Sequence, residues 1–414
     1  MRITRIENGF SRAPQPPDVE QAVREVLDAV AAGGDAAVIE FTERFDRAEL
    51  GPEQLRVDSH ELEASIGVLE PAVLDGLRSA IGNVRAVARA QLGELAAVDL
   101  PQGHRVEIAE ASVRRAAIYV PGGEAPYPST VVMGAVTARA AGVDEIVVCA
   151  PPGPGGRAHP VILAACVLCE VQEVYRMGGA QAIGALAYGT ESVRRVDVIV
   201  GPGNPYVQEA KRQVAWTHVG IDGIAGPSEL AVVAAGDGVD PELIALDLLA
   251  QSEHGENSPL WLLSPDRELL DAVAAAVERL EPERPSTRDA ELQLITARSI
   301  GDALTIVDAI APEHLELVGD EAEALADRVR FAGCVFVGSG AATAFGDYVA
   351  GSNHVLPTGG AARFQSALSP ATFRRRMARV SLPGEAPARL APAGAAIARA
   401  EGFPVHAESM ERRA

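Results

Sequence analysis

The sequence predicts an α/β protein that contains two sets of alternating strands and helices. In residues 116–229, short β-branched runs are each followed by a glycine-rich turn and a helical segment. A second set begins near Leu230 and closes at Gly338. Such alternation is typical of βαβ units, whose strands form parallel sheets. The two sets could therefore be a duplicated architecture.

The part of the chain before these sets predicts mainly helices. Residues Val19 to Ala32 carry apolar side chains at helical spacing, and Gly33-Gly34 is expected to end that helix. Two further helical patterns follow, in residues 61–66 and 72–92.

Individual strands can be read from the apolar runs. The first set contains AAIYV, EIVVCA, QEVYR and VDVIV, and the second contains LAVVAA, PLWLLS and CVFVG. After Phe364 the chain is rich in Arg and Ala, and it predicts helices without a strand pattern. A terminal arm of this kind often docks on a partner subunit, although the composition does not require it.

Composition excludes several classes of protein. The 414 residues suffice for two or more domains, and the net charge of -21 disfavours nucleic-acid binding because an acidic surface repels phosphate. The start of the chain does not resemble a signal peptide, and charges interrupt the apolar run of residues 131–150, so we expect no membrane contact. Four cysteines are too few for a disulfide scaffold, which favours a cytoplasmic location. Cys166 and Cys169 are expected to be buried helix residues, since no second pair completes a thiolate site.

Three of the glycine-rich turns that follow predicted strands are candidates for phosphate binding. The turn GPGN, Gly201 to Asn204, opens a helix, so its backbone N–H groups and the helix dipole suit a phosphate. It is not the G-x-G-x-x-G pattern, and a plain βα turn explains it equally well. The same alternatives apply to Gly122-Gly123 and Gly178-Gly179.

The segment QSEHGENS lies at the end of a predicted helix. Asp240 can cap this helix, Pro241 is its first residue, and it should end near His254, before Gly255. Gln251 and His254 are three residues apart and are expected to share one face. His254 is either a metal ligand or a simple C-terminal cap, and glutamine is an uncommon ligand of zinc.

The segment APEHLE places Glu313 next to His314. After Pro312 we expect both residues in the first turn of a short helix, where the dipole favours an ionised Glu and a neutral His. Both forms suit base catalysis near neutral pH. An acidic helix cap beside a surface histidine remains the alternative.

Two further segments carry polar side chains. In GDYVAGSNHVLPTGG, Asp347 and His354 are seven residues apart in a glycine-rich loop, where Asp347 could also be a turn residue. EGFPVH contains Glu401 and His406 close to the end of the chain, where a histidine is usually solvated and inert.

Taken together, these motifs resemble the histidinol dehydrogenase family. YVPGG, GGAQAIGALAYGT, GPGNPYVQEAKRQV, VGIDGIAGPSE, QSEHG, APEHLE, GDYVAGSNHVLPT and EGFPVH fit its pattern in the same order, from RFD near the N-terminus almost to the last residue. Ser252 and the Phe403-Pro404 pair depart from the usual residues of the family, and they touch no expected ligand or base.

The resemblance implies a complete set of site residues. The catalytic pair would be Glu313 and His314. One zinc ion per subunit would be bound by Gln251, His254, Asp347 and His406. NAD would be contacted by Tyr119, Gln181 and Asn204. The substrate would be held by Ser228, His354, Glu401, His314 and the zinc ligands.

The resemblance also implies an architecture and a reaction. It implies two incomplete Rossmann-like domains, the first made of residues 15–115 and 230–365 with the metal and catalytic residues, and the second of residues 116–229 on the NAD side. Arms 1–14 and 366–414 would form a homodimer in which His406 and Glu401 act in trans. The reaction would be the four-electron, NAD-linked oxidation of L-histidinol through bound L-histidinal to L-histidine, the last step of histidine biosynthesis.

Other functions stay open from the sequence. The same scaffold could oxidise another small polar alcohol, such as a sulfonated diol. A zinc hydrolase would use Glu313 to activate water and would not need NAD. A non-catalytic binding protein would have no need for a Gln-His-Asp-His set beside a Glu-His pair.

Overall fold

The computed structural model describes residues 1–7, 9–12, 17–93, 96–122 and 125–414. The chain divides into two compact units, one made of residues 1–91 and 114–373 and the other of residues 92–113 and 374–414. Unit 1 contains two parallel sheets with helices on both faces, and unit 2 contains one antiparallel sheet and two helices. The predicted α/β fold class is therefore confirmed.

Sheet A is the first parallel sheet of unit 1. Its strands, in spatial order, are β1 (Arg2–Ile6), β11 (Glu291–Thr296), β10 (Leu260–Ser264), β9 (Leu230–Ala234), β12 (His314–Val318) and β13 (Cys334–Val337). Three of the inner strands, β10, β9 and β12, are buried along their whole length, which explains the nearly continuous apolar sequences of β9 and β10.

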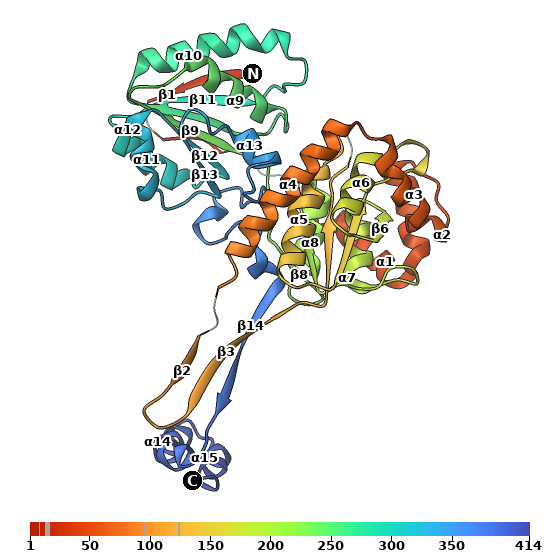
Figure 1. The fold of residues 1–414 in the computed structure, drawn as a ribbon, viewed down its shortest axis with the longest axis vertical. Helices are drawn as coiled ribbons and strands as arrows, with labels where there is room; N and C mark the ends of the chain where they lie inside the picture. The colour runs from red at the N-terminus through yellow and green to blue at the C-terminus, as the bar shows by residue number, and fades with distance from the viewer. Residues whose placement is uncertain (8, 13–16, 94–95, 123–124) are drawn as a thin grey trace. The chain divides into compact units, whose positions relative to one another are not determined.

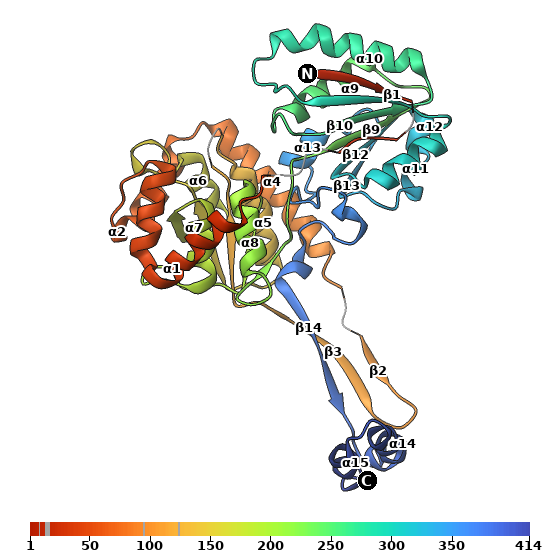
Figure 2. The ribbon, with the colours of Figure 1, turned by 180° about the vertical axis from the view of Figure 1, so that it is seen from behind.

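Five helices belong to sheet A. They are α9 (Pro241–Ser252), α10 (Arg267–Leu280), α11 (Ile300–Ile310), α12 (Asp320–Glu323) and α13 (Thr343–Tyr348). Helices α9 and α10 share a core with one face of the sheet, and α11 and α12 share a core with the other. Figures 1 and 2 show α10 and α11 on opposite sides of the strands.

Sheet B is the second parallel sheet of unit 1. Its strands, in spatial order, are β6 (Glu173–Arg176), β5 (Glu145–Ala150), β4 (Arg115–Tyr119), β7 (Val198–Val200) and β8 (Gly220–Ile221). The helices between them are α5 (Pro128–Ala140), α6 (Pro160–Leu168), α7 (Gly179–Tyr188) and α8 (Pro205–Val214). These elements agree with the predicted first set. Cys166 and Cys169 are buried free thiols, as expected.

The N-terminal helices pack beside sheet B, and this corrects the expected grouping. They are α1 (Glu20–Phe41), α2 (Pro52–Leu55), α3 (Ser59–Ala64) and α4 (Pro71–Ala90). The apolar stripe of α1 enters the same core as α7, α8 and sheet B, while α4 packs on α5. Residues 20–90 were expected to join the domain of sheet A, because sequence periodicity shows an apolar face but not its partner.

The ends of α1 and of the N-terminal segment also differ from expectation. Helix α1 does not stop at Gly33-Gly34 but continues to Phe41 across a kink at Gly34, where φ is 54°. Glycine tolerates this left-handed backbone, and a Cβ at this position would lie 2.3 Å from the Glu191 carboxylate. Residues 2–6 form strand β1, which pairs in parallel with β11, whereas residues 1–14 were expected to be an arm.

Unit 2 contains a sheet that the sequence did not predict. Its antiparallel strands are β14 (Arg374–Ser381), β3 (Arg105–Ser112) and β2 (Ala97–Asp99), in that spatial order, and its helices are α14 (Ala386–Ala400) and α15 (Pro404–Glu411). The expectation of no strand after Phe364 is wrong. Arginines hide the strand pattern of β14, and two of them, Arg374 and Arg376, pair with Glu110 of β3.

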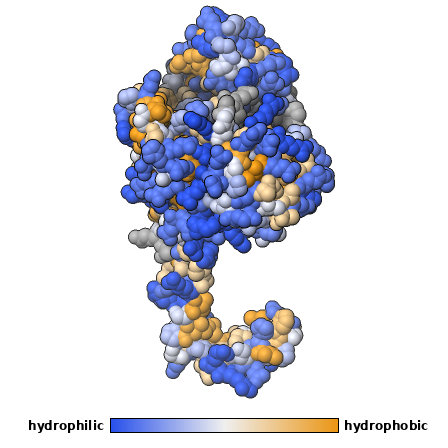
Figure 3. Space-filling model, turned by 90° about the vertical axis from the view of Figure 1, so that its right-hand side faces the viewer, coloured by the Kyte–Doolittle hydropathy of each residue, from blue (hydrophilic) through white to orange (hydrophobic). Residues whose placement is uncertain are grey.

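Apolar side chains are exposed on unit 2. They include Val98, Val380, Leu382, Ile397, Phe403 and Val405, and apolar surface of this unit is visible in Figure 3. Across the described part of the chain, none of the helices is long and apolar enough to cross a bilayer.

Candidate active site

Glu313 and His314 lie at the start of strand β12, not in a helix. Helix α11 ends at Ile310 and is followed by Ala311, whose φ of 49° is left-handed, and by Pro312. His314 then pairs with Leu230 of β9 and Cys334 of β13. The expected short helix is wrong. The backbone groups of HLELV form hydrogen bonds with two neighbouring strands, and local sequence does not reveal this strand pairing.

Glu313 is a buried carboxyl group with two hydrogen-bond donors. Its Oε2 accepts hydrogen bonds from Ser228 Oγ at 2.6 Å and from the Glu229 backbone N–H at 2.9 Å. Burial raises the pKa of Glu313 to about 7, against the opposing effect of these two donors. The side chain can therefore exchange a proton near neutral pH. The cause is burial, and not the helix dipole that was expected from the sequence.

His314 is held by a backbone carbonyl group. Its Nδ1 lies 3.1 Å from the Glu229 carbonyl oxygen, which can only accept, so Nδ1 carries the hydrogen and Nε2 keeps a lone pair. Burial lowers the pKa of His314, so the neutral form is favoured. Nε2 lies 3.7 Å from Asp347 Oδ1.

Three side chains that were expected to bind a metal lie around this pair. Gln251 is in the last turn of α9, and its Nε2 donates to Ser228 Oγ at 2.7 Å. His254 lies just after the helix, and its Nε2 is 3.9 Å from Oδ2 of Asp347 in α13. Asp240 caps α9 as predicted, by accepting from the Glu242 N–H.

The amide, imidazole and carboxylate of these three side chains are groups that can each bind a zinc ion. Among the described residues, no group of three or more His, Cys, Asp or Glu side chains is arranged to hold a metal. The expected ligands from unit 1 would not form such a group, because only two of the three are His, Cys, Asp or Glu. They are one amide, one imidazole and one carboxylate. Two tetrahedral ligands, each about 2 Å from zinc, lie roughly 3.4 Å apart. The observed 3.9 Å between His254 and Asp347 is close to that spacing.

His354 contacts the backbone of Asp347. Its Nδ1 is 2.9 Å from the Asp347 carbonyl oxygen, and its Nε2 is 3.4 Å from Thr130 Oγ1 of α5. Burial lowers the pKa of His354, so this ring is held neutral. The structure thus brings together Ser228, Gln251, His254, Glu313, His314, Asp347 and His354 from four separate parts of unit 1.

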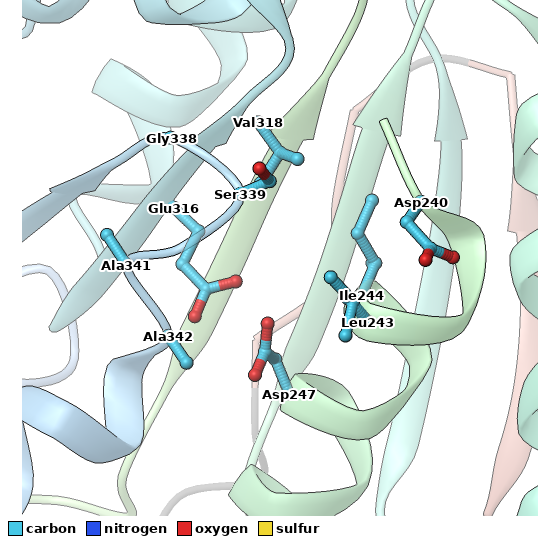
Figure 4. A pocket seen from close by; sticks show the side chains of 10 residues that line it. All are labelled: Asp240, Leu243, Ile244, Asp247, Glu316, Val318, Gly338, Ser339, Ala341 and Ala342. Carbon is cyan, nitrogen blue, oxygen red and sulfur yellow. The ribbon is translucent and has the colours of Figure 1, made fainter. Parts of the chain in front are cut away.

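The carboxyl groups of Glu316 and Asp247 support α9 and α13, the helices that carry Gln251 and Asp347. Glu316 Oε1 accepts from the N–H of Thr343 at 2.8 Å and from its hydroxyl at 2.7 Å, at the first residue of α13. Figure 4 shows the Glu316 carboxyl group facing Asp247 of α9. Burial raises the pKa of Glu316 to about 8 and that of Asp247 to about 6, so the pair favours holding a proton. Strand β12 is thereby tied to both α9 and α13.

The residues expected to contact NAD lie at the carboxyl ends of sheet B. Tyr119 ends β4, and its hydroxyl accepts from the Gly179 N–H at 3.1 Å, at the start of α7. Gln181 is fully buried, its Nε2 donates to Asp46 at 3.3 Å, and its Oε1 has no hydrogen-bond partner within the described residues. Asn204 caps α8 by accepting from the Val207 N–H.

The arrangement at this edge suits a dinucleotide. Two helix N-termini, those of α7 and α8, follow strands β6 and β7, and ligands of open α/β sheets bind outside the carboxyl ends of strands. The unpartnered oxygen of Gln181 is a further acceptor for a bound group. Gly178 is the N-cap residue of α7, whereas Gly123 of the first turn lies outside the described residues.

The remaining two candidates belong to unit 2. Glu401 follows the last residue of α14, and His406 lies in α15, where both side chains are exposed. The His406 ring contacts the Phe403 ring at a centroid distance of 5.3 Å.

The sequence analysis missed residues that support the site. Glu229 supplies backbone groups to both Glu313 and His314, and its own carboxyl is buried with a pKa raised to about 7 by burial and by Glu313. Glu316 could have been noticed, because an acid two residues after His314 in an apolar strand lies on the same face of the sheet. Asp46, the last residue of the RFD motif, and Asp247 are separated in sequence from the residues that they contact, and no local pattern indicated these contacts.

Comparison with known proteins identifies the family. The family model described as histidinol dehydrogenase matches residues 11–414. The chain belongs to the histidinol dehydrogenase family. It is an oxidoreductase of this family, and the resemblance inferred from the motifs is confirmed.

Individual relatives agree with this membership. The histidinol dehydrogenase of Cereibacter sphaeroides is 46% identical over 403 residues, covering 96% of this chain and 92% of the relative. That of Gluconobacter oxydans is 42% identical over 409 residues, covering 97% of this chain and 94% of the relative. The crystal structure of histidinol dehydrogenase from Elizabethkingia anophelis superimposes with a TM-score of 0.93 at 31% identity, covering 100% of this chain and 98% of that chain.

Proposed function

We propose that this protein oxidises L-histidinol through bound L-histidinal to L-histidine, the last step of histidine biosynthesis, with two NAD consumed per substrate and one zinc ion per subunit. The observation that carries the proposal is the convergence on Asp347. Its Oδ2 lies 3.9 Å from His254 Nε2 and its Oδ1 lies 3.7 Å from His314 Nε2. A metal candidate and a base candidate therefore face the same carboxylate.

The zinc ion would be held by Gln251, His254 and Asp347 of one subunit and by His406 of the partner subunit. When bound, zinc would orient the imidazole and amino groups of histidinol and withdraw charge from them. Gln251 can ligate through its amide oxygen, because its amide nitrogen already donates to Ser228. Ser228 and His354 of one subunit and Glu401 of the partner subunit would complete the substrate site.

His314 is the base for the alcohol step. Its Nε2 has a lone pair and takes the hydroxyl proton, while the carbon loses a hydride and becomes the aldehyde carbon. NAD, lying near Tyr119, Gln181 and Asn204, would supply the hydride acceptor in both steps. The low pKa of His314 keeps the ring available as a base at neutral pH.

Glu313 is the base for the hydration of the aldehyde. It takes a proton from water as the water oxygen adds to the aldehyde carbon, and protonated His314 returns the proton of the alcohol step to the former carbonyl oxygen, which gives the hydrate and restores His314 as a base. His314 then takes a hydroxyl proton of the hydrate as the second hydride leaves, and the carboxylic acid forms. A carboxyl group with a pKa of about 7 can both take this proton and release it near neutral pH.

We further propose a cytoplasmic homodimer built by unit 2. The exposed apolar side chains of α14, α15 and the turn between them, among them Ile397, Phe403 and Val405, are suited to burial against a second copy. This arrangement would give His406 and Glu401 a role that exposed residues near a chain end otherwise lack.

The test is an assay of the purified protein with zinc, NAD and L-histidinol. Two NADH per histidine are expected. NADH from other small polar alcohols only, such as sulfonated diols, would instead support a dehydrogenase of different specificity on the same scaffold. Amide hydrolysis without NADH would support the zinc hydrolase.

A further inference from the structure

Lys211 is the only lysine of the chain, and the other 35 of its 36 Lys and Arg residues are arginines. Its side chain is 1% exposed, in helix α8. Lysine presents a compact ammonium group with three donors, whereas arginine presents a wide planar fork. The structure therefore places the single lysine where a small buried cation is required.

The ammonium group of Lys211 is bound to the GPGN turn. Nζ donates to the Gly201 carbonyl oxygen at 2.9 Å and to Asp222 Oδ1, while Asp222 Oδ2 accepts from the Gly201 N–H at 2.7 Å. Both backbone polar groups of Gly201 are therefore held by this one ion pair.

The geometry of Gly201 leaves the turn little freedom. Its φ is 119°, and a Cβ at this position would lie 2.1 Å from the Tyr119 carbonyl oxygen. The turn therefore packs closely against the backbone of Tyr119 at the end of β4. Release of either partner of the ion pair would free the Gly201 peptide to rotate, because one of its two polar groups would lose its partner.

Asp222 connects this turn to the segment that supports the catalytic pair. It follows β8 and begins the stretch that ends in Ser228 and Glu229, the residues that bind Glu313 and His314. Its carbonyl oxygen accepts from Gln365 Nε2 at 2.9 Å, which fixes its backbone.

We infer that Lys211 and Asp222 form a positioning pair, which holds the GPGN turn in the conformation that receives the pyrophosphate of NAD. The inference rests on the proposed function, since it requires NAD at this turn. Neither side chain would touch NAD itself: Lys211 is enclosed, and its charge is neutralised by Asp222. The pair acts through Gly201 on the N–H groups at the start of α8.

The first test compares steady-state kinetics of Lys211→Met, Asp222→Asn and the double variant. In each single variant the KM for NAD should rise by about tenfold or more, while kcat and the KM for histidinol change by less than about threefold. In the double variant the effects should be less than multiplicative, because the second change no longer leaves a buried charge unpaired.

Arg212→Met is the matched control. Arg212 is the next residue on the same helix, half exposed, and pairs with Glu209. This variant loses one cation but should keep the KM for NAD of the wild type. A folded Lys211→Met protein with an unchanged KM for NAD, or a variant whose only change is an apparent kcat reduced in proportion to lost folded protein, would overturn the inference.

The second test does not depend on activity and uses the single lysine as a probe. Acetylation followed by intact-mass measurement can label only Lys211 and the terminal amine. Lys211 should react far more slowly in the folded protein than in denatured protein, Asp222→Asn should accelerate its labelling, and NAD should slow it. Equal rates with and without NAD, in a wild type that reduces NAD, would overturn the inference. Failure of the wild type to reduce NAD with any alcohol would instead reject the proposed function.

Discussion

The Nδ1 atom of His314 lies 3.1 Å from the carbonyl oxygen of Glu229, and this contact turns Nε2 of the same ring towards Asp347. The same Glu229 residue donates its backbone N–H to Glu313. One residue before β9 therefore fixes both members of the proposed catalytic pair, through backbone groups that a substitution of its side chain would leave in place.

Replacement of His314 by Asn should abolish the alcohol step. An amide cannot accept a proton at neutral pH, so kcat should fall by about 10²–10⁴-fold, the usual contribution of a positioned base. In the wild type, the lowered pKa of His314 predicts that kcat/KM for histidinol rises with pH only below about 6.5 and is flat above it. Rate measurements from pH 5 to 9 test this, and an alcohol step that survives in His314→Asn would exclude this base.

Glu313→Gln should slow the oxidation of histidinal more than that of histidinol. Glutamine can still accept from Ser228 and Glu229, but it cannot take a proton from water. Because the pKa of Glu313 is about 7, the aldehyde step of the wild type should increase as the pH rises through about 7. Stopped-flow measurement of NADH formation from each substrate separates the two steps. Equal loss in both would refute the division of tasks between Glu313 and His314.

Glu316→Gln should change the pH dependence of stability. The pKa of Glu316 is raised from 4.5 to about 8, so the folded state binds more protons than the unfolded state between these values. This contribution to stability is complete below about pH 4.5 and is lost as the pH rises through about 8, with a slope of at most about 1.4 kcal/mol per pH unit. Glutamine imitates the protonated form, so the variant should lose less stability between pH 5 and 8.

The measurement for Glu316 is denaturant unfolding at several pH values. Thr343→Val is the matched variant, because it removes one hydrogen bond to Glu316 and leaves the carboxyl group in place. It should lower stability by about 1 kcal/mol and, unlike Glu316→Gln, keep the loss of stability as the pH rises. Identical pH profiles for wild type and Glu316→Gln would contradict the proton held by Glu316 and Asp247.

His254→Asn should reduce zinc content together with activity. Chelation should inactivate the wild type, and added zinc should restore it, with about one zinc per subunit by elemental analysis. Glu253→Gln is the control, since Glu253 is the exposed neighbour of His254 and binds Ser286 instead. Full zinc content in His254→Asn would remove this residue from the ligand set.

Mixed dimers test whether His406 acts in trans. His406→Asn and Asp347→Asn subunits should each be inactive alone, because each homodimer lacks a ligand in both sites. After unfolding and refolding together, about half of the dimers would be mixed and contain one intact site, so about a quarter of wild-type activity should return. No recovery, with dimers formed, would argue against a shared site.

Local patterns predicted the strands of both parallel sheets, because each is a short apolar run bounded by turn residues. They failed at β14, where Arg374 and Arg376 interrupt the apolar pattern and are neutralised by Glu110 of another strand. They also failed at Glu313 and His314, since the pairing of His314 with Leu230 and Cys334 is a contact between distant segments. The grouping of α1 with sheet B was missed for the same reason.

The sequence by itself determined the family, the βα order and the identity of the candidate side chains, because these depend on residue types and their spacing. The tertiary structure alone decided which faces pack together, and with them the environment of each side chain. The pKa of Glu313, the free nitrogen of His314 and the proton held between Asp247 and Glu316 come from burial and from partners far along the chain. Desolvation and long-range hydrogen bonds depend on three-dimensional neighbours, which no local pattern contains.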